Sequence, residues 1–400
     1  MNKINVVWLC VTPIAQLNHI LKLKKVPQVI APWITALLCE LKNRKDIRLS
    51  VISTGPGWKK SYYFNEEGIN YYFIRRFTPS FMKLFKEYLR LDRYLNAIYL
   101  KREVKHLVKK INPDIINLHG TEHEICASFP QLTGNKILTI QGFINLVYKE
   151  NPNKYLRKQL AIENKIFNTT TDFIIQAGFM PDLIREYNPE ARFHFCQYPS
   201  IQPAIEASGF TKEAQLIFAS RICREKGIED LLNAIVKVIE KLPGMKVKII
   251  GKVSSNEYEH FLKKLIRESR LEQNIDFIGF VPSYDELYRH IAKSEILVLP
   301  THHDVIPSSV IESMLIGTAV ISTNVGGLPD LNLEKQTCIL VEKQDVDGLA
   351  ESIINLLNDK QKQEQLIINA REMVLRDFNA VTIVNHLIEI YRTKLALKTN

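Results

Sequence analysis

Two acidic side chains flank the predicted start of a helix in the second half of the chain. Asp304 lies in a polar loop after a buried apolar run, and Glu312 follows it in the pattern D-x7-E. Pro307, Ser308 and Ser309 lie between them and are typical of a helix start, because proline is favoured in the first turn and serine near the cap. The start of a helix that follows a strand offers free N–H groups and a positive dipole end to a phosphate. We therefore predict an anion site beside two carboxylates that can accept hydrogen bonds from sugar hydroxyls.

Two basic side chains follow an earlier predicted strand. Arg221 comes directly after this strand, Lys226 stands later in the same loop, and Gly227 permits a tight entry into the next helix. An arginine guanidinium binds phosphate oxygens in bidentate fashion, and a lysine ammonium adds a point charge. The loop therefore indicates binding of a diphosphate.

Short β-branched runs alternate with helical segments in both halves of the chain, which is typical of parallel α/β layers. The run from Tyr198 to Pro203 lacks strand character and contains two prolines, so we predict a linker there. We expect two Rossmann-like domains, residues 1–200 and 201–380, with ligands beyond the carboxyl ends of their strands, where two facing edges would form a cleft. The predicted strands are Ile4–Val11, Ile47–Ser53, Ile115–Leu118, Lys136–Ile140, Asp172–Gln176, Gln215–Ala219, Lys246–Ile250, Asp276–Ile278, Ile296–Leu299, Ala319–Ser322 and Cys338–Val341.

Composition excludes several classes of protein. Apolar residues make up 46% and charged residues 24% of the 400 residues, which is ordinary globular composition and argues against wholesale disorder. No uninterrupted apolar run reaches the length of about 18 residues that a membrane-spanning helix needs, and the first residues lack the pattern of a signal peptide. We expect a cytoplasmic protein. The 6 cysteines are scattered without a C-x-x-C pair, which argues against structural zinc and against a disulfide framework.

The formal charge of +10 is unevenly distributed. Residues 1–200 contain 29 Lys and Arg against 16 Asp and Glu, whereas residues 201–400 contain 24 against 27. A basic first half fits nucleic acid, an anionic membrane surface or a phosphorylated acceptor. No recognised nucleic-acid module is present, so we expect no nucleic-acid partner.

The stretch Lys83–Lys110 is basic and aromatic, and Leu84, Tyr88, Leu91 and Leu95 recur in it at helical spacing. One interpretation is a helix that docks on an anionic membrane, where a lipid-linked acceptor lies. The other is a helix packed on its own domain with a solvated basic face. Both interpretations stay open, and the residues that would contact acceptor or membrane are Lys101, Arg102 and Lys105.

The segment Leu299–Asp330 resembles the signature of the retaining glycosyltransferases of family 4, which have two Rossmann-like domains in the GT-B fold. The family pattern is E-x7-E followed by V-G-G-x-P-E, and this chain has Asp304, Glu312 and then Val325–Asp330 in the same spacing. Both Asp304 and Asp330 are one methylene shorter than the usual glutamate. The resemblance implies that Glu312 binds the nucleotide ribose and that Asp304 contacts the donor sugar.

Two further segments extend this resemblance. Arg221 and Lys226 match the family loop G-R-L-x-x-x-K-G, with Ser220 where glycine is usual, and would neutralise the departing diphosphate. The turn at Gly279 and Val281 matches F-x-G-x-V, whose backbone lines the nucleobase. The expected donor-binding residues are therefore Glu312, Ser308, Ser309, Val281, Gly279 and Ile306.

In the first half, a buried strand ends at His119, where the family has a histidine near the donor sugar. We assign His119 a catalytic role together with Arg221, Lys226 and Asp304. Many relatives have Gly-Gly after the first strand, whereas this chain has Thr12-Pro13, and proline removes an amide donor. Either another backbone segment contacts the diphosphate, or the phosphates rely on the two cations and the helix start.

The resemblance implies a retaining hexosyltransferase that moves a sugar from a nucleoside diphosphate sugar, with UDP favoured, to a glycan acceptor. We expect a lipid-linked oligosaccharide acceptor in bacterial surface-polysaccharide (capsule or O-antigen) biosynthesis, and peripheral location on the inner face of the cytoplasmic membrane. The fixed cations Arg221 and Lys226 make a metal ion unnecessary, and no G-x-G-x-x-G fingerprint is present, so we expect neither a metal ion nor a cofactor. The last helix, residues 381–400, would cross back to the first domain as in the family. Alternatives are a GT-B epimerase or phosphorylase, and a non-catalytic nucleotide-sugar-binding scaffold.

Overall fold

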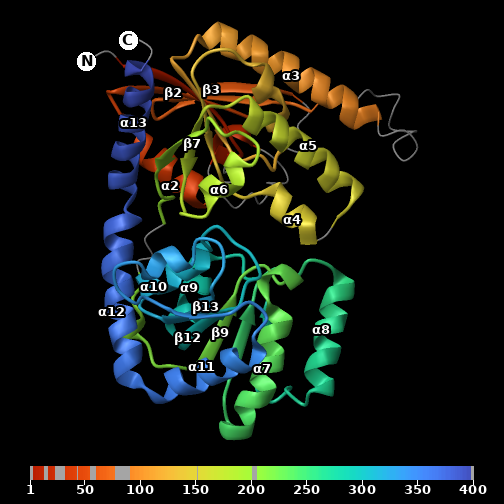
Figure 1. Cartoon of the computed structure of the whole chain (residues 1–400), viewed down its shortest axis with the longest axis vertical. Coiled ribbons are helices and arrows are strands. Elements are labelled where there is room, and N and C mark those ends of the chain that lie inside the picture. The colour runs from red at the N-terminus through yellow and green to blue at the C-terminus, as the bar shows by residue number, and fades with distance from the viewer. Residues whose placement is uncertain are drawn as a thin grey trace. The chain divides into compact units, whose positions relative to one another are not determined.

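The computed structural model describes residues 3–12, 17–22, 32–42, 44–54, 60–76, 91–150, 152–200 and 205–397. It divides into two compact units (Figure 1), one formed by Met1–Pro199 with Ala380–Asn400 and the other by Ser200–Asn379. Each unit has a mainly parallel sheet with helices on both faces, so the predicted class of two Rossmann-like α/β domains is confirmed. All the strands predicted from the sequence are present, with ends shifted by one or two residues.

The first unit has an 8-stranded sheet in the order β3-β4-β2-β1-β5-β6-β7-β8. Only β3 runs antiparallel to its neighbour. The chain starts in the middle of the sheet, so the switch in strand order falls between β1 and β5. The strands are β1 (Ile4–Leu9), β2 (Ile47–Thr54), β3 (Tyr62–Glu66), β4 (Ile69–Ile74), β5 (Ile115–His119), β6 (Lys136–Thr139), β7 (Asp172–Ile175) and β8 (Arg192–Phe195).

Three strands of this sheet were missing from the prediction. Strands β3 and β4 form a hairpin whose turn residues Glu67 and Gly68 have φ values of 48° and 83°. Positive φ at both central residues is the geometry of a two-residue turn that matches the twist of antiparallel strands. The Glu-Gly pair between two tyrosine-rich runs is the sequence signal from which this hairpin could have been predicted.

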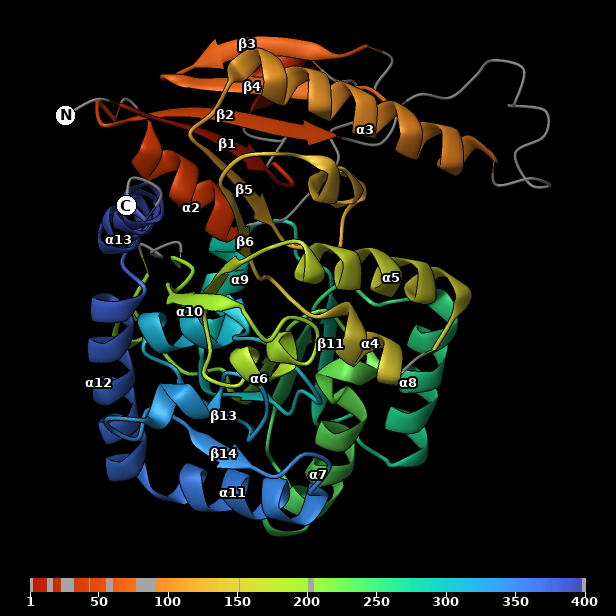
Figure 2. The ribbon, with the colours of Figure 1, turned by 45° about the horizontal axis from the view of Figure 1, so that its top comes forward.

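The helices of the first unit cover both faces of the sheet. Helices α2 and α13 pack against each other on one face, and α3 lies on the other (Figure 2). Leu100, Val104 and Leu107 of α3 are buried, so its apolar side faces its own unit. The helices are α1 (Asn18–Leu21), α2 (Pro32–Leu41), α3 (Leu91–Ile111), the 3-10 helix η3 (Glu124–Gln131), α4 (Ile144–Glu150), α5 (Lys154–Asn168), α6 (Met180–Arg185) and α13 (Ala380–Ala396).

Helix α13, the last helix of the chain, is anchored in the first unit by buried polar contacts. The hydroxyl of Tyr391 accepts hydrogen bonds from Nε1 of Trp8 at 2.9 Å and from Nδ2 of Asn117 at 2.7 Å. Further along the helix, Lys394 forms an ion pair with Asp172, whose side chain is fully buried. Buried donors and charges are costly without partners, so α13 is an integral part of the first unit.

The second unit has a 6-stranded sheet in the order β11-β10-β9-β12-β13-β14. All its strand pairs are parallel. The chain runs from β9 outward to β11 and then returns to β12 on the other side of β9. The strand order therefore switches between β9 and β12, where a ligand is expected at the carboxyl ends. The strands are β9 (Ala214–Ala219), β10 (Val247–Ile250), β11 (Ile275–Gly279), β12 (Ser294–Leu299), β13 (Ala319–Thr323) and β14 (Ile339–Val341).

Helices also cover both faces of the second sheet, with α7 and α11 packed together on one face and α9, α10 and α12 in contact on the other. A single apolar cluster fills the space between sheet and helices. The elements are the 3-10 helices η4 (Ala207–Gly209), η5 (Arg224–Lys226) and η6 (Pro329–Asn332), with α7 (Ile228–Lys241), α8 (Asn256–Glu268), α9 (Tyr284–Ala292), α10 (Ser308–Ile316), α11 (Val346–Asn358) and α12 (Lys360–Asp377).

Candidate functional site

The carboxyl ends of β9 and β12 bring two predicted site residues into contact. Lys226 lies in η5, directly after β9, and Asp304 lies in the loop after β12. Nζ of Lys226 and Oδ2 of Asp304 form an ion pair. Their side chains are only 16% and 19% exposed, so the pair is largely shielded from water. A shielded cation at the switch point of the sheet is suited to hold a phosphate.

Hydrogen bonds fasten the two loops that carry this ion pair. The carbonyl oxygen of Glu225 accepts hydrogen bonds from the backbone N–H of His302 at 2.8 Å and from the hydroxyl of Thr301 at 3.1 Å. Nε2 of His302 lies 2.7 Å from Oδ2 of Asp230 in α7. Sequence reasoning missed this His302–Asp230 pair, because only the fold brings the two residues together. The loops therefore hold Lys226 and Asp304 in one arrangement.

Two glycines allow the loops to approach this closely. Gly227 has a φ of 70°, and a Cβ atom there would lie 1.8 Å from the carbonyl oxygen of Pro300. Gly326, after β13, has a φ of 58°, and a Cβ atom there would lie 1.7 Å from the carbonyl oxygen of Asp304. A larger residue would be strained at either position and would push the loops apart.

Helix α10 begins beside Asp304, as the proline and serine pattern predicts. Pro307 is its N-cap residue and forms no side-chain capping hydrogen bond. Ser308 is exposed and Ser309 is partly exposed in the first turn. The helix ends at Gly317, which has a φ of 92° and donates its N–H to the carbonyl oxygen of Ser313. The start of the helix therefore offers backbone N–H groups and two hydroxyls to an anion.

Glu312 lies one turn into α10 and is 4% exposed. Burial raises the pKa of Glu312 from 4.5 to about 8, because an apolar environment disfavours the charged carboxylate. The charge of Glu312 in turn contributes to the raised pKa values of Tyr284 and Tyr288 in α9, for which burial is the larger cause. The two tyrosine rings lie with their centroids 5.8 Å apart. Sequence reasoning missed both tyrosines, although their i, i+4 spacing would place them on one side of a helix.

The other predicted donor residues lie around the same edge of the sheet. Arg221 is exposed directly after β9, and Ile306 is partly buried between Asp304 and α10. Gly279 ends β11 with a φ of 77°, and its carbonyl oxygen accepts a hydrogen bond from Gly251 at 2.8 Å. Val281 is partly buried against the core of the unit, in the turn that leads into α9. Because α9 packs on α10, this turn is on the same side of the unit as Glu312.

In the first unit, His119 ends β5 beside the switch point and is 1% exposed. Its ring lies 4.4 Å from the ring of Trp8, centroid to centroid. Within the described residues, neither ring nitrogen of His119 has a hydrogen-bond partner. Burial lowers the pKa of His119 to about 3, so the imidazole is neutral at ordinary pH. A neutral histidine with two unpaired nitrogens can donate one hydrogen bond to a ligand and accept another.

A polar cluster surrounds the loop after His119. The carboxyl group of Glu122 lies over two glycines, since a Cβ atom at Gly120 would lie 2.4 Å from it and one at Gly142 would lie 2.8 Å from it. The carbonyl oxygen of His119 lies 2.7 Å from Nε2 of His123. Glu124 points elsewhere and forms an ion pair with Arg76.

The predicted acceptor or membrane residues lie on the basic side of α3. Arg102 and Lys105 are exposed, and Lys101 is partly exposed. Of the apolar stripe predicted in this stretch, Leu84 and Tyr88 lie outside the described residues. The first loop is described only as far as Thr12, which is buried, and Pro13 lies outside the described residues.

Two kinds of feature are absent from the described residues. No group of three or more His, Cys, Asp or Glu side chains there could hold a metal ion. Across the same ranges, no helix combines the length and the apolar character that crossing a membrane requires.

Solved structures identify the class of fold that these two units form. The sucrose-phosphate synthase from Thermosynechococcus elongatus superimposes with a TM-score of 0.72 over 99% of this chain and 100% of that chain, at 17% identity. The Anabaena protein Alr3699/HepE, solved with UDP and glucose, gives a TM-score of 0.67 over 98% and 100%, at 13% identity. At such low identity the likeness concerns the fold alone, and this fold is GT-B.

A family model matches most of the second unit. Residues 201–373 match the family model described as glycosyl transferases group 1. N-acetyl-alpha-D-glucosaminyl L-malate synthase from Bacillus anthracis is 24% identical over 344 residues, which are 82% of this chain and 83% of that protein.

Other curated relatives match over a shorter region. Glycogen synthase from Mycobacterium tuberculosis is 25% identical over 45% of this chain and 43% of its own length. The capsular polysaccharide biosynthesis glycosyltransferase CapM from Staphylococcus aureus is 27% identical over 44% and 46%. Such alignments span less than half the length of these relatives.

Proposed function

We propose that this chain is a retaining glycosyltransferase of family 4, a hexosyltransferase that uses a nucleoside diphosphate sugar. The observation that carries the proposal is the convergence of a shielded lysine, an acidic residue and a helix start at the switch point of a Rossmann-like sheet. Lys226, Asp304 and α10 all reach the carboxyl ends of β9 and β12. The match of residues 201–373 to the group 1 glycosyl transferases supports the same function.

In the proposed mechanism, fixed positive charge stabilises the departing diphosphate. Lys226, Arg221 and the start of α10 would bind the phosphates, and the acceptor hydroxyl would attack the anomeric carbon on the face that the diphosphate leaves. The bond from the anomeric carbon to the phosphate oxygen breaks as the new glycosidic bond forms on the same face, the hydroxyl proton passes to the departing phosphate oxygen, and the configuration is retained. Glu312 would bind the ribose, and the backbone at Gly279 and Val281 would line the base. These cations make a metal ion unnecessary in the proposed reaction.

We favour UDP as the nucleotide, since the structurally similar Anabaena protein was solved with UDP and glucose. Thermal unfolding with UDP, GDP, ADP and NAD tests this choice on the wild type and on Glu312→Ala. A ligand at 100 times its dissociation constant stabilises the folded state by about 2.7 kcal/mol. We expect UDP to raise the melting temperature of the wild type and not that of Glu312→Ala. If none of the four nucleotides raises it, the proposed donor site is wrong.

For the acceptor, we propose a lipid-linked oligosaccharide of bacterial surface-polysaccharide biosynthesis. The capsular polysaccharide glycosyltransferase among the relatives supports this class, and so does the exposed basic side of α3. Because the described apolar side of α3 is buried in its own unit, membrane docking would rely on charge in this part of the helix. Reversal of the charges of Lys101, Arg102 and Lys105 should then abolish sedimentation with anionic vesicles, and unchanged sedimentation would contradict peripheral membrane location.

A binding scaffold without turnover is the second candidate function. The ion pair between Lys226 and Asp304 favours it, because an internal carboxylate already neutralises the cation that the diphosphate would need. Release of UDP from UDP-glucose or UDP-N-acetylglucosamine in the presence of a glycan acceptor distinguishes the two. Nucleotide binding without release under any acceptor condition would favour the scaffold.

A further inference from the structure

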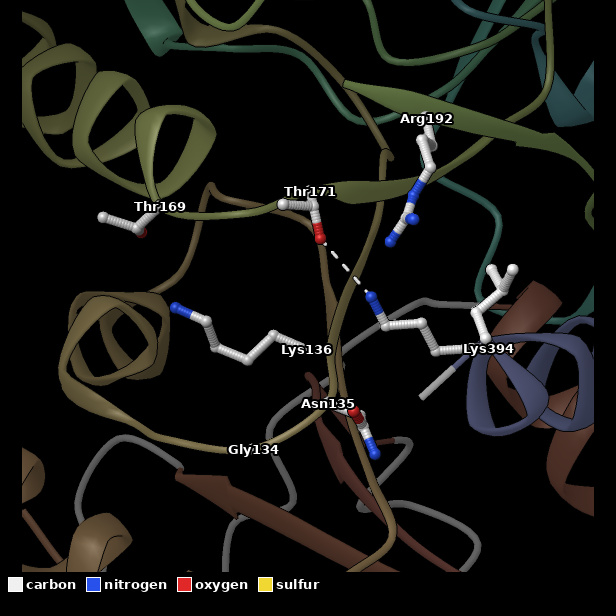
Figure 3. A pocket seen from close by; sticks show the side chains of 8 residues that line it. Gly134, Asn135, Lys136, Thr169, Thr171, Arg192 and Lys394 are labelled. Carbon is white, nitrogen blue, oxygen red and sulfur yellow. Dashed lines mark hydrogen bonds between the residues drawn. The ribbon is translucent and has the colours of Figure 1, made fainter. Parts of the chain in front are cut away.

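A pocket lies in the first unit, at the edge of the sheet opposite to the one where His119 lies. It has a volume of about 360 Å³ and is formed at the amino ends of β6, β7 and β8 together with the end of α13 (Figure 3). This edge carries none of the residues assigned to glycosyl transfer. The lining residues are Gly134, Asn135, Lys136, Thr169, Thr171, Arg192, Lys394 and Leu397.

Positive charge is in excess in this pocket. Lys136, Arg192 and Lys394 line it, and among the described residues the carboxylate beside them is that of Asp172, which pairs with both Arg192 and Lys394. Arg192 and Lys394 reach toward Thr171 from one side in Figure 3, and Lys136 extends on the other. The arrangement leaves a net positive charge that a small anion would neutralise.

Lys136 is the cation whose charge is least compensated. It is partly buried, and among the described residues its Nζ is close only to the ring of Phe129, 5.1 Å from the centroid. Burial lowers the pKa of Lys136, with no carboxylate to raise it again. A partly buried ammonium group that no carboxylate contacts gains more from an anionic ligand than a solvated lysine does.

The same pocket offers hydrogen-bond acceptors. Oδ1 of Asn135 is buried and has no partner in the part of the chain that the structure describes. The hydroxyl of Thr171 already donates its hydrogen to Asp172 at 2.6 Å, and that of Thr169 donates to the carbonyl oxygen of Lys165 at 2.9 Å. The Thr171 oxygen also accepts a hydrogen bond from Nζ of Lys394 at 3.3 Å and has one lone pair left, whereas the Asn135 and Thr169 oxygens accept none from the described residues. These acceptors suit a ligand that brings hydroxyl donors of its own.

We propose that this pocket binds a small phosphorylated sugar, with the phosphate group on Lys136 and the sugar hydroxyls on Asn135 and the two threonines. An ammonium group without a carboxylate partner, set beside hydrogen-bond acceptors, distinguishes such a ligand from bare phosphate, which has no sugar hydroxyls to donate. The site is separate from the residues that we propose for glycosyl transfer, and its ligand would bind to the first unit.

The test is isothermal titration of the full chain with glucose 6-phosphate, glucose and inorganic phosphate. We expect glucose 6-phosphate to bind at least ten times more tightly than inorganic phosphate, and glucose not to bind. Lys136→Gln should weaken glucose 6-phosphate at least tenfold. This variant removes no ion pair, so it should fold, which circular dichroism checks. Lys158→Gln, at an exposed position of α5, is the matched control and should bind as the wild type does.

Two further measurements separate this pocket from the proposed donor site and locate the bound ligand on the chain. Lys226→Gln in the second unit should leave glucose 6-phosphate binding unchanged, which separates this pocket from the proposed donor site. Amide hydrogen exchange should slow at residues 134–136 and 192 when the ligand is bound. No binding of glucose 6-phosphate, or binding that Lys136→Gln leaves intact, overturns the proposal. If inorganic phosphate binds as tightly as glucose 6-phosphate, the proposal that the pocket recognises the sugar is overturned.

Discussion

Lys226 and Asp304 form an ion pair across the point where the strand order of the second sheet switches. The two residues come from different loops, and backbone hydrogen bonds hold those loops together. The pair occupies the position that the proposed diphosphate would need, so the carboxylate and the phosphate compete for one ammonium group.

This competition predicts opposite effects of two substitutions on UDP affinity. Lys226→Gln should weaken UDP binding at least tenfold, because the cation is lost. Asp304→Asn should strengthen it about threefold to tenfold, which is about 0.6 to 1.4 kcal/mol, since a competing negative charge is removed. Isothermal titration measures both, and Lys237→Gln, which breaks the exposed pair with Asp347, is the control without effect. Weaker binding by Asp304→Asn would contradict the competition.

Glu312 should make the stability of the protein depend on pH. Its pKa is raised by burial from 4.5 to about 8, so the folded state holds a proton there that the unfolded state loses between these values. This group therefore lowers stability as pH rises from 4.5 to 8. Glu312→Gln should raise the melting temperature relative to the wild type by about 2–4 °C more at pH 8.5 than at pH 5.5.

Differential scanning calorimetry at the two pH values checks this prediction. Glu272→Gln, at an exposed position of the same unit, should show no such difference between them. A difference of the opposite sign for Glu312→Gln would mean that the carboxylate is stabilised in the folded state.

Tyr391→Phe should destabilise the first unit by about 2 kcal/mol, because it leaves the buried donors of Trp8 and Asn117 without an acceptor. Urea unfolding, followed by tryptophan fluorescence, measures the change. Tyr63→Phe is a suitable comparison, since Tyr63 is 55% exposed, and it should change stability by less than about 0.5 kcal/mol. Equal effects of the two substitutions would show that the hydroxyl of Tyr391 contributes nothing.

Asp172→Asn should cost about 3 kcal/mol of stability at pH 7, because it leaves the buried ammonium group of Lys394 without its carboxylate. Burial alone would raise the pKa of Asp172, but hydrogen bonds from His194, Arg192 and Lys394 outweigh it and hold the pKa well below its usual range. A carboxyl with a lowered pKa stabilises the fold above about pH 4, and this contribution is lost as the pH falls further. The difference between wild type and Asp172→Asn should therefore shrink in acid, which urea unfolding at pH 7 and pH 3 measures.

The sequence predicted the parallel strands because each is a short apolar run bounded by turn residues. It missed the β3–β4 hairpin, whose tyrosines do not alternate with polar residues in the usual pattern. It located Lys226, Asp304 and Glu312 as chemical groups, since their spacing resembles a known signature. It could not show that Lys226 and Asp304 pair with each other, or that Tyr284 and Tyr288 lie beside Glu312, because such contacts depend on which loops and helices the fold brings together.

The place of α13 in the first unit has a consequence for how the chain is made. A ribosome releases residues in order, and the second unit is one continuous stretch, Ser200–Asn379. The strands of the first unit are synthesised early, but Tyr391 and Lys394 follow only after the second unit. During this interval Asp172 lacks the ammonium group of Lys394, and the indole N–H of Trp8 lacks the hydroxyl of Tyr391 as its acceptor. The first unit is therefore completed only after the second unit has been synthesised.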